Sequence, residues 1–210
     1  MGYEDLEPSR SALLFFDLLN GYYRGADEAT QQRMEPVVAN AVRLMQAARS
    51  VSIPVVYAAA NHRPDQATTA LLITDTDMRL HPWPDPQRNR TRPGIVAGSW
   101  QAEVIDEIRP LPGDYVVPKY RWSAFHQTYL ELALRTRGVH TIVIAGGSTD
   151  VGIASTVFAA RDLDFHQVIV SDACISSHED NHAQFMERIF PRMARVRTTD
   201  QVVAMMAAGG

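Results

Sequence analysis

An acid, a cation and a glycine-rich turn each follow a predicted strand in this chain. Asp17 comes directly after the apolar run 11–16, Lys119 follows another short strand, and Gly152 lies in the turn after the strand at 141–145. The carboxyl ends of parallel strands converge on one crevice of an open α/β sheet, so we expect these three positions to face one another. A carboxylate and an ammonium held there would perturb each other's pKa. The pattern indicates a site for acid–base chemistry.

Each of these features also has an ordinary interpretation. An aspartate after a strand often caps a turn, and a lysine there is usually a solvated charge. The strand at 141–145 runs into Gly146 and Gly147, and a helix is expected from about 151 to 161. One of the polar residues 148–150 would cap that helix. The free N–H groups of its first turn would hold an oxyanion, or the turn is simply tightly packed and without chemistry.

The composition is that of an ordinary globular protein. The 210 residues carry 20 basic and 24 acidic side chains, a net charge of −4, which gives no basic footprint for nucleic acid or an anionic membrane. The single cysteine, Cys174, excludes an intramolecular disulfide and is best interpreted as a small buried residue. No apolar run approaches the roughly 20 residues of a membrane-spanning helix. We therefore expect one cytoplasmic domain over 1–210.

Apolar runs and helical periodicities alternate along the chain. Five or six short strands are expected, at 11–16, 54–57, 115–117, 141–145, 167–170 and, at an edge, 194–196. Helices are expected at about 30–50, 102–108, 128–137, 151–161 and 179–190, with a last one capped by 198–200. This alternation predicts an α/β fold with three α/β/α layers and a parallel, Rossmann-like sheet of five or six strands. The proline-rich segment 61–100 is expected to form a substrate-side lid or a subunit contact.

Five segments in chain order resemble the isochorismatase-like hydrolase superfamily, also called the cysteine hydrolases. They are the strand and acid at 13–20, the strand and loop at 55–57 and 62–65, the lysine segment 116–125, the glycine turn 146–156, and the landmarks Ser171-Asp172-Ala173 and His182. The lysine segment, which contains Lys-Tyr-Arg-Trp-Ser-Ala-Phe, is the most specific of them. The resemblance covers nearly the whole chain and implies an isochorismatase-type fold.

The resemblance implies a catalytic triad of Asp, Lys and Cys, of which two members are present. Asp17 and Lys119 match, whereas Gly152 stands where the family has its cysteine, and Cys174 follows a different strand. Isochorismatases proper look like this, with glycine at that position. They cleave a vinyl ether, which needs a proton donor more than a nucleophile. By this analogy Asp17 is the acid, Lys119 orients or balances the substrate carboxylate, and Arg121 pairs with a carboxylate if it points inward.

Other side chains near this site are expected to bind the substrate. They are His62, Arg121, Trp122, Phe125 and Val151. The aromatic residues, with Trp83 and Trp100, have the alternative role of core or subunit contacts. Nicotinamidases, which are metal-containing relatives, place an Asp and several His in this region. Because His62, Asp65 and His81 lack convincing ligand spacing here, we expect neither a metal nor another cofactor. The resemblance also implies a homo-oligomer that acts on a small molecule.

The substrate stays open at this stage. Residues 60–62 and Leu19 replace glutamines of the isochorismatases, and 149–151 looks more like the amide-cleaving branch. The first hypothesis is a cofactor-free hydrolase of a small, carboxylated or cyclic substrate that cleaves a vinyl ether or, through Asp-activated water, an amide. The ether route is physically easier, because an amide route would lack covalent catalysis. The alternatives are a binding protein that has lost its nucleophile and an engineered Gly152.

Overall fold

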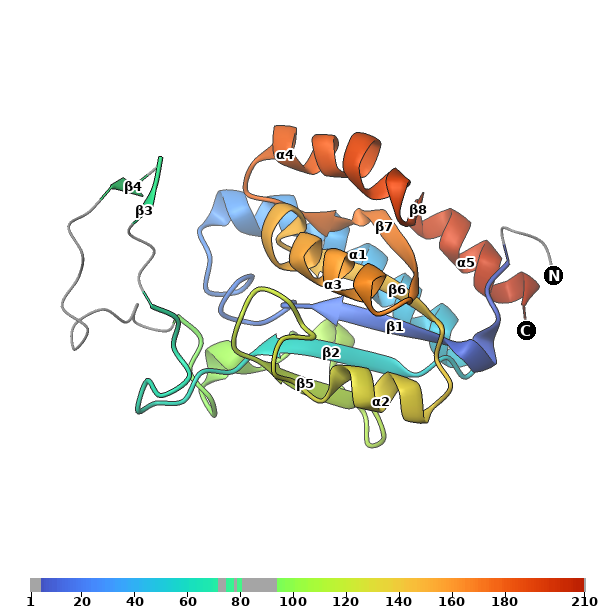
Figure 1. Ribbon diagram of the computed structural model, residues 1–210, viewed down its shortest axis with the longest axis horizontal. Coiled ribbons are helices and arrows are strands. Elements are labelled where there is room, and N and C mark those ends of the chain that lie inside the picture. The colour runs from blue at the N-terminus through green and yellow to red at the C-terminus, as the bar shows by residue number, and fades with distance from the viewer. Residues whose placement is uncertain (1–4, 72–74, 78, 81–93, 210) are drawn as a thin grey trace.

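The centre of the molecule is a parallel sheet of six strands, shown in the computed structural model of Figure 1. The structure describes residues 5–71, 75–77, 79–80 and 94–209. The spatial order is β5-β2-β1-β6-β7-β8, and every neighbouring pair is parallel. The strands are β1 (Ser11–Phe16), β2 (Val55–Ala60), β5 (Tyr115–Lys119), β6 (Thr141–Gly147), β7 (His166–Ile175) and β8 (Arg195–Arg197). The expected parallel α/β sheet is confirmed.

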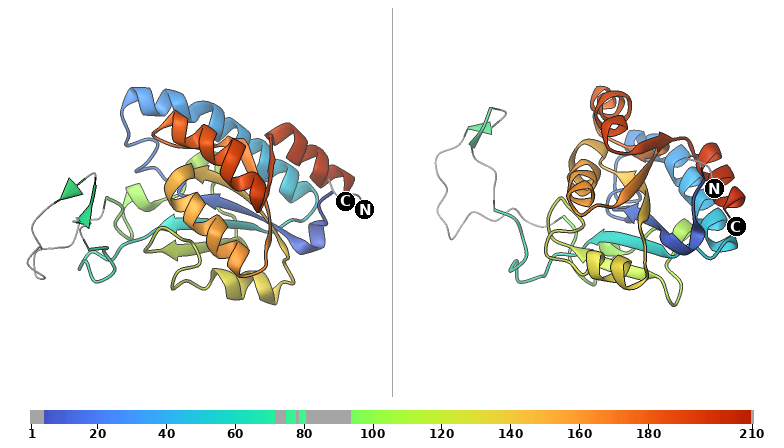
Figure 2. Two further views of the ribbon diagram at one scale, coloured as in Figure 1. Left: turned by 45° about the horizontal axis from the view of Figure 1, so that its top comes forward. Right: turned by 45° about the vertical axis from the view of Figure 1, so that its right-hand side comes forward.

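Helices cover both faces of this sheet, so the fold has three layers (Figure 2). Alternate residues of β1 face opposite layers: Leu13 and Phe15 pack on the side of α1 and α5, and Leu14 and Phe16 pack on the side of α2 and α3. Burial of each such side chain stabilises the fold by about 1.5–3 kcal/mol, which is why a continuous apolar run becomes a central strand. The helices are α1 (Glu28–Ser50), α2 (Leu130–Thr136), α3 (Ala154–Asp162), α4 (Glu179–Gln184) and α5 (Thr199–Ala208).

The strand order reverses at β1. The chain leaves β1 through α1 to β2 and β5 on one side, and it returns through α2 to β6 on the other side. In open α/β sheets, the crevice beyond the carboxyl ends of the strands at such a reversal is the usual place for a ligand. The topology therefore directs attention to the residues that follow β1, β5 and β6.

The strand β5 is longer than its sequence suggested. The proline at position 118 ended the expected strand, yet β5 continues through Pro118, which pairs with Ala59 of β2. β5 lies at the edge of the sheet, where a missing N–H on the open side interrupts no ladder. The longer strand carries Lys119 to the carboxyl edge.

The prediction of a helix at 102–108 is wrong. Two 3₁₀ turns, Trp100–Ala102 and Asp106–Ile108, stand there instead. Between them Val104 forms an isolated bridge with Leu19. Its two neighbours bond to the loop after β1: the N–H of Ile105 donates to the carbonyl of Leu18, and the carbonyl of Glu103 accepts the N–H of Asn20. Tertiary pairing has overridden local helical preference in this short segment.

Only parts of the segment 61–100 belong to the described structure. A short antiparallel ribbon pairs β3 (Asp75–Thr76) with β4 (Arg79–Leu80), and His62 forms a bridge with Val96. Residues 72–74, 78 and 81–93 lie outside the described residues, and with them the roles considered for His81, Trp83 and a lid or subunit contact in this region. No helix in the described part of the chain combines the length and the apolar character needed to cross a bilayer.

Candidate active site

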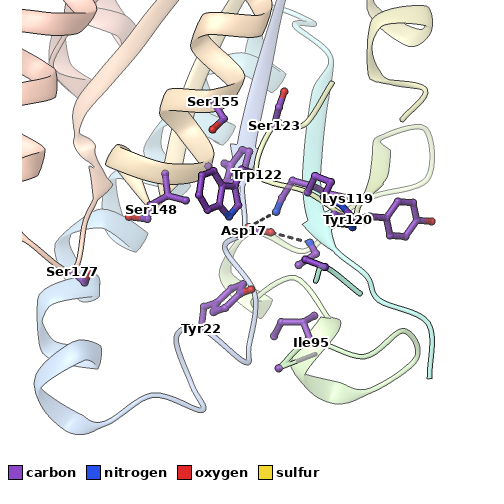
Figure 3. Close-up of a pocket in the computed structure, with 18 of the residues that line it drawn as sticks. Asp17, Tyr22, Ile95, Lys119, Tyr120, Trp122, Ser123, Ser148, Ser155 and Ser177 are labelled. Carbon is purple, nitrogen blue, oxygen red and sulfur yellow. Dashed lines mark hydrogen bonds and ion pairs between the residues drawn. The ribbon is translucent and has the colours of Figure 1, made fainter. Parts of the chain in front are cut away.

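Asp17 and Lys119 meet at the carboxyl edge of the sheet, directly after β1 and at the end of β5. The Nζ of Lys119 lies 2.8 Å from Oδ2 of Asp17, and the two side chains are only 8% and 10% exposed. The other carboxylate oxygen, Oδ1, accepts the backbone N–H of Ala60 at 2.8 Å. Figure 3 shows both interactions as dashed lines. The structure thus brings together the acid and the cation that the sequence had placed after two different strands, which β2 separates in the sheet.

The backbone around Asp17 is shaped for this position. Asp17 has a φ of +51°, in the left-handed region that Asp adopts more readily than most residues, and this turn ends β1. Its N–H still donates to the carbonyl of Ala58 at 3.0 Å. On the other side Gly146 has a φ of +128°, and a Cβ there would lie 2.1 Å from the carbonyl oxygen of Phe16. Only glycine lets β6 approach β1 this closely.

Burial dominates the electrostatics of Asp17. It raises the pKa of the carboxyl above its usual range, while the Lys119 ammonium and the Ala60 N–H oppose that rise. The group therefore holds a proton to a higher pH than a surface carboxyl does, which is the property of a general acid. The ammonium of Lys119 also lies 4.7 Å from the centroid of the Phe16 ring, within the range of a cation–π contact.

The pair opens onto a cavity of about 1010 Å³. Among the described residues that line it, Asp17 is the one carboxylic acid, whereas Lys119, Arg33 and Arg121 are cationic. Lys119 is already paired with Asp17, so the two arginines give the described part of the cavity lining an excess of positive charge. A cavity of this charge favours a small anionic ligand.

Gly152 lies on the cavity wall at a point where a side chain has no room. It is buried in a π-helical turn, Thr149–Ile153, that leads into α3. A Cβ on Gly152 would lie 2.3 Å from Cε1 and 2.6 Å from Cζ of Phe16. The Phe16 ring thus occupies the space beside Gly152. The one cysteine, Cys174, is buried in β7, and burial raises the pKa of its thiol to about 12, as expected for a structural residue.

Asp150 organises the same turn through hydrogen bonds. Its carboxylate accepts the hydroxyl of Ser148 at 2.5 Å, the hydroxyl of Ser176 at 2.8 Å and the amide of Asn181 at 2.7 Å. Partial burial raises the pKa of Asp150, but these donors outweigh burial and hold the pKa below its ordinary value. Ser148, one of the three residues considered for capping, precedes the turn and makes no side-chain cap bond. Asp150 instead ties this turn to the segment that follows β7.

Most of the residues expected to bind substrate line the cavity. Trp122 is 58% exposed, so its indole offers a large apolar surface to a ligand. One guanidinium nitrogen of Arg121, Nη1, donates to the carbonyls of Thr68 at 2.9 Å and Tyr120 at 2.6 Å, which holds this exposed side chain in place. The expected residues found in the lining are His62, Arg121, Trp122 and Val151.

Phe125 is the exception. Its ring stacks on Phe165 at a centroid distance of 5.7 Å, and it packs against the core on the side of α2 and α3. It is absent from the described lining of the cavity. The lysine segment turns inward after Ser123, where the N–H of Ala124 donates to the buried hydroxyl of Thr156 at 2.9 Å. The core role considered as the alternative for Phe125 is the one that the structure shows.

The polar side chains near His62 make ordinary contacts. Asp65 pairs with Arg63 at 2.7 Å. Nδ1 of His62 lies 3.2 Å from the carbonyl oxygen of Thr68, and burial lowers the pKa of the imidazole, which is therefore neutral at pH 7. Within the described ranges, no three or more His, Cys, Asp or Glu side chains are grouped to hold a metal ion.

Tyr22 and Arg33 are two of the polar cavity residues that were not singled out from the sequence. Figure 3 shows Tyr22, in the turn after β1, with its hydroxyl end directed toward Asp17. Burial and the charge of Asp17 raise the pKa of Tyr22, so the hydroxyl is protonated at neutral pH. Arg33 lines the cavity from the N-terminal part of α1. Neither residue belongs to a motif. They reach the cavity because the connection from β1 through α1 to β2 passes over the carboxyl edge of the sheet, which only the fold reveals.

Comparisons with known proteins agree with this architecture. A model of the isochorismatase domain matches residues 11–201. The uncharacterized isochorismatase family protein YwoC of Bacillus subtilis is 39% identical over 108 residues, and the match spans about half of either protein, 51% of this chain and 57% of YwoC. Ureidoacrylate amidohydrolase RutB of Pseudomonas syringae is 29% identical over 184 residues, 80% of this chain and 71% of RutB.

Solved structures extend the match to almost the whole chain. An isochorismatase family protein from Burkholderia thailandensis superimposes with a TM-score of 0.75 and 30% identity, and the superposition covers 97% of this chain and 98% of that protein. The domain match, which runs from the first residue of β1 into α5, covers all six strands of the sheet. The chain therefore belongs to the isochorismatase family.

Proposed function

We propose that this protein is an isochorismatase-like hydrolase of a small, carboxylated or cyclic substrate. Asp17 is its general acid/base and Lys119 is the electrostatic partner of Asp17. The observation that carries this proposal is the 2.8 Å ion pair, about nine-tenths buried, that opens onto the 1010 Å³ cavity. Buried ion pairs contribute little net stability, so one placed at a cavity and containing an acid of raised pKa favours a role in chemistry.

Cleavage of a vinyl ether suits a site that has an acid and no side-chain nucleophile. Protonated Asp17 donates its proton to the terminal carbon of the enol ether, and the carbon bonded to oxygen becomes an oxocarbenium ion. Water adds to that carbon, and the proton that water loses returns to the Asp17 carboxylate. The resulting hemiketal then expels the alcohol and leaves a ketone. Lys119 stabilises the ionised form of Asp17 during the cycle.

The other cavity residues bind and orient the substrate in this proposal. Arg121 and Arg33 attract its carboxylate, and a free guanidinium edge matches a carboxylate with two parallel hydrogen bonds. The protonated hydroxyl of Tyr22 donates a hydrogen bond to water or substrate next to Asp17. Trp122 and Val151 cover the apolar part of the ligand, and neutral His62 supplies a further polar contact.

Hydrolysis of an amide is the second candidate. The similarity to RutB, which is named as an amidohydrolase, favours it. In this route ionised Asp17 takes a proton from water, the hydroxide attacks the amide carbon, and the amine leaves with that proton. Because no thiol stands at position 152, the reaction lacks a covalent intermediate that would divide the barrier into two smaller ones. We therefore place it second.

A substrate panel measured across pH separates the two routes. Vinyl-ether turnover requires protonated Asp17, so its rate falls as pH rises through the raised pKa of that group. Amide turnover requires ionised Asp17, so its rate rises through the same pKa. Turnover that is unchanged in Asp17→Asn would contradict both routes. A ligand that raises the melting temperature without being turned over would point to a binding protein instead.

We also propose that the chain forms a homo-oligomer. Large apolar side chains stand on the described surface outside the cavity, among them Trp100, Leu132 and Phe158, which are 50%, 66% and 47% exposed. Contacts between subunits would remove such surface from water. Light scattering coupled to gel filtration measures the mass directly, and a monomer at micromolar concentration would refute the proposal.

A further inference from the structure

Phe16 and Gly152 are fitted to each other beside the ion pair. Phe16 is 1% exposed at the end of β1, and Gly152 is buried in the turn before α3. The first carbon of any side chain at position 152 would lie 2.3 Å from Cε1 and 2.6 Å from Cζ of the ring. Carbon atoms in favourable contact are about 3.5–4.0 Å apart. A side chain at position 152 therefore requires the ring to move.

Phe16 borders the cavity, yet it is only 1% exposed, and neighbouring side chains fill much of the space around its ring. Phe16 belongs to the buried cluster on the side of α2 and α3, together with Ile144 of β6 and Ile153 of the π-helical turn. Its face carries the ammonium of Lys119, 4.7 Å from the centroid. Protein interiors are packed as densely as organic crystals, so a displaced ring displaces its neighbours. One side chain thus both fills the space of a nucleophile and supports the cation of the ion pair.

We propose that Phe16 is a specificity-determining residue of this site. Its ring excludes a nucleophilic side chain from position 152 and so restricts the site to reactions in which water is the nucleophile. The inference rests on the proposed function only in taking Asp17 and Lys119 as the reacting groups. Conversion to a thiol site then requires two changes. Gly152→Cys alone creates a thiol without room, whereas Phe16→Val with Gly152→Cys places a thiol near the Lys119 ammonium, where its pKa is lowered.

Alkylation of the folded protein by iodoacetamide tests this without knowledge of the substrate. The wild-type protein supplies the baseline, because Cys174 is buried and burial raises the pKa of its thiol to about 12. We expect Phe16→Val/Gly152→Cys to be alkylated at least about 10-fold faster than Gly152→Cys, because only the double variant frees the thiol and exposes it to the ammonium. Equal rates in the two variants would overturn the proposal.

Phe15→Val/Gly152→Cys is the matched control. Phe15 is also 1% exposed and precedes Phe16 in β1, but it packs on the opposite face of the sheet, against Tyr57. The control removes the same core volume and leaves the Phe16 ring over position 152. We expect its thiol to be alkylated as slowly as that of Gly152→Cys. Fast alkylation of the control would show that general loosening of the core, rather than the Phe16 ring, governs access.

Alanine variants give a second measurement in case the cysteine variant does not fold. Gly152→Ala adds only the Cβ, and we expect the midpoint of thermal unfolding to fall by roughly 2–10 °C. Phe16→Val/Gly152→Ala loses less than the sum of the two single losses, because the smaller side chain admits the Cβ. Phe15→Val/Gly152→Ala loses the full sum. Simple additivity in both pairs would refute the inference.

Neither measurement depends on turnover. If no compound of the panel is hydrolysed, the proposed function fails and the relation between Phe16 and Gly152 stands. If Gly152→Cys keeps the wild-type melting temperature and is alkylated rapidly, this inference fails and the proposed function stands.

Discussion

Two turns at the same edge of the sheet hold a carboxylate in opposite ways. After β1, Asp17 is buried with one ammonium and one N–H as partners, and its pKa is raised. In the turn after β6, Asp150 is partly exposed, accepts hydrogen bonds from Ser148, Ser176 and Asn181, and has a lowered pKa. The two side chains are chemically identical, so their surroundings alone divide their roles.

The difference follows from what each environment does to the charged form. Burial destabilises the ionised carboxylate of Asp17 more than the Lys119 ammonium and the Ala60 N–H stabilise it. The pKa therefore rises, and the group can hold and release a proton. Three donors at Asp150 outweigh a smaller loss of solvent, so the carboxylate stays ionised and serves as a fixed acceptor. In the proposed function the turn after β1 therefore carries the chemistry, and the turn after β6 places Gly152, which has no side chain, on the cavity wall.

The largest expected effect follows from Asp17→Asn. The amide keeps the size of the carboxyl but neither donates nor accepts a proton in the reaction, so turnover of the best substrate should fall by about 10²–10⁴-fold. Steady-state kinetics measures the loss. Asp162→Asn, at the exposed end of α3, is the matched control and should keep the wild-type rate. A loss below 10-fold for Asp17→Asn would remove the distinction between the two turns.

Lys119→Met tests the other half of the ion pair. The variant leaves the Asp17 carboxylate buried without its cation, which costs about 3–5 kcal/mol for a pair removed from water. Urea unfolding at pH 7 measures the change in the free energy of unfolding. The double variant Asp17→Asn/Lys119→Met should be more stable than the sum of the single variants predicts, because it leaves no uncompensated charge. Strict additivity would mean that the two groups do not interact in solution.

Asp150→Ala should produce a smaller effect of another kind. The variant leaves the hydroxyl and amide donors of the turn without their acceptor and should lower the free energy of unfolding by about 1–3 kcal/mol. Because Asp150 takes no part in proton transfer, the pH at which the rate changes should stay that of the wild type. Asp180→Ala, on the exposed side of α4, serves as the control. A displaced pH profile in Asp150→Ala would give the turn after β6 a direct role in the chemistry.

The smallest effect is expected at the rim. Arg121→Gln removes a charge that attracts an anionic substrate, and we expect KM to rise about 10-fold while kcat changes little, because the interaction is the same in the ground state and the transition state. A neutral analogue of the substrate should show no such rise. Arg188→Gln, at an exposed position of the π-helical segment Phe185–Ile189 and outside the described cavity lining, is the matched control. A fall in kcat with KM unchanged would place Arg121 among the reacting groups.

Much of the architecture could be read from local pattern. The run Ser11–Phe16 forms β1 at its expected bounds, because six consecutive apolar or small residues suit a strand buried on both faces. Gly138, with a φ of +67°, follows α2 as the expected helix stop. The positions of Asp17 and Lys119 followed from the same reasoning, since strand ends in a parallel sheet share one edge.

Other parts of the site depend on contacts between segments that are far apart in the sequence, and no sequence pattern predicts those contacts. Phe125 belongs to the lysine segment, the most specific motif, yet it packs on Phe165 and does not line the described cavity, whereas Lys119 and the residues up to Ser123 do. Tyr22 and Arg33 carry no motif, yet they line the cavity because the first crossover passes over the carboxyl edge. Sequence spacing says which residues share an element, but the packing of elements decides which side chains face the same space.

The sequence by itself determined the alternation of strands and helices, the acid and the cation at the sheet edge, and the absence of a cysteine in the glycine turn. Periodicity and the position of a residue at a strand end are local properties, which is why the amino-acid sequence alone predicts them. Only the tertiary structure decided that Asp17 and Lys119 are buried together and that the ring of Phe16 occupies the space beside Gly152. Burial and exclusion are properties of a packed volume, and a chain acquires them only when distant segments come into contact.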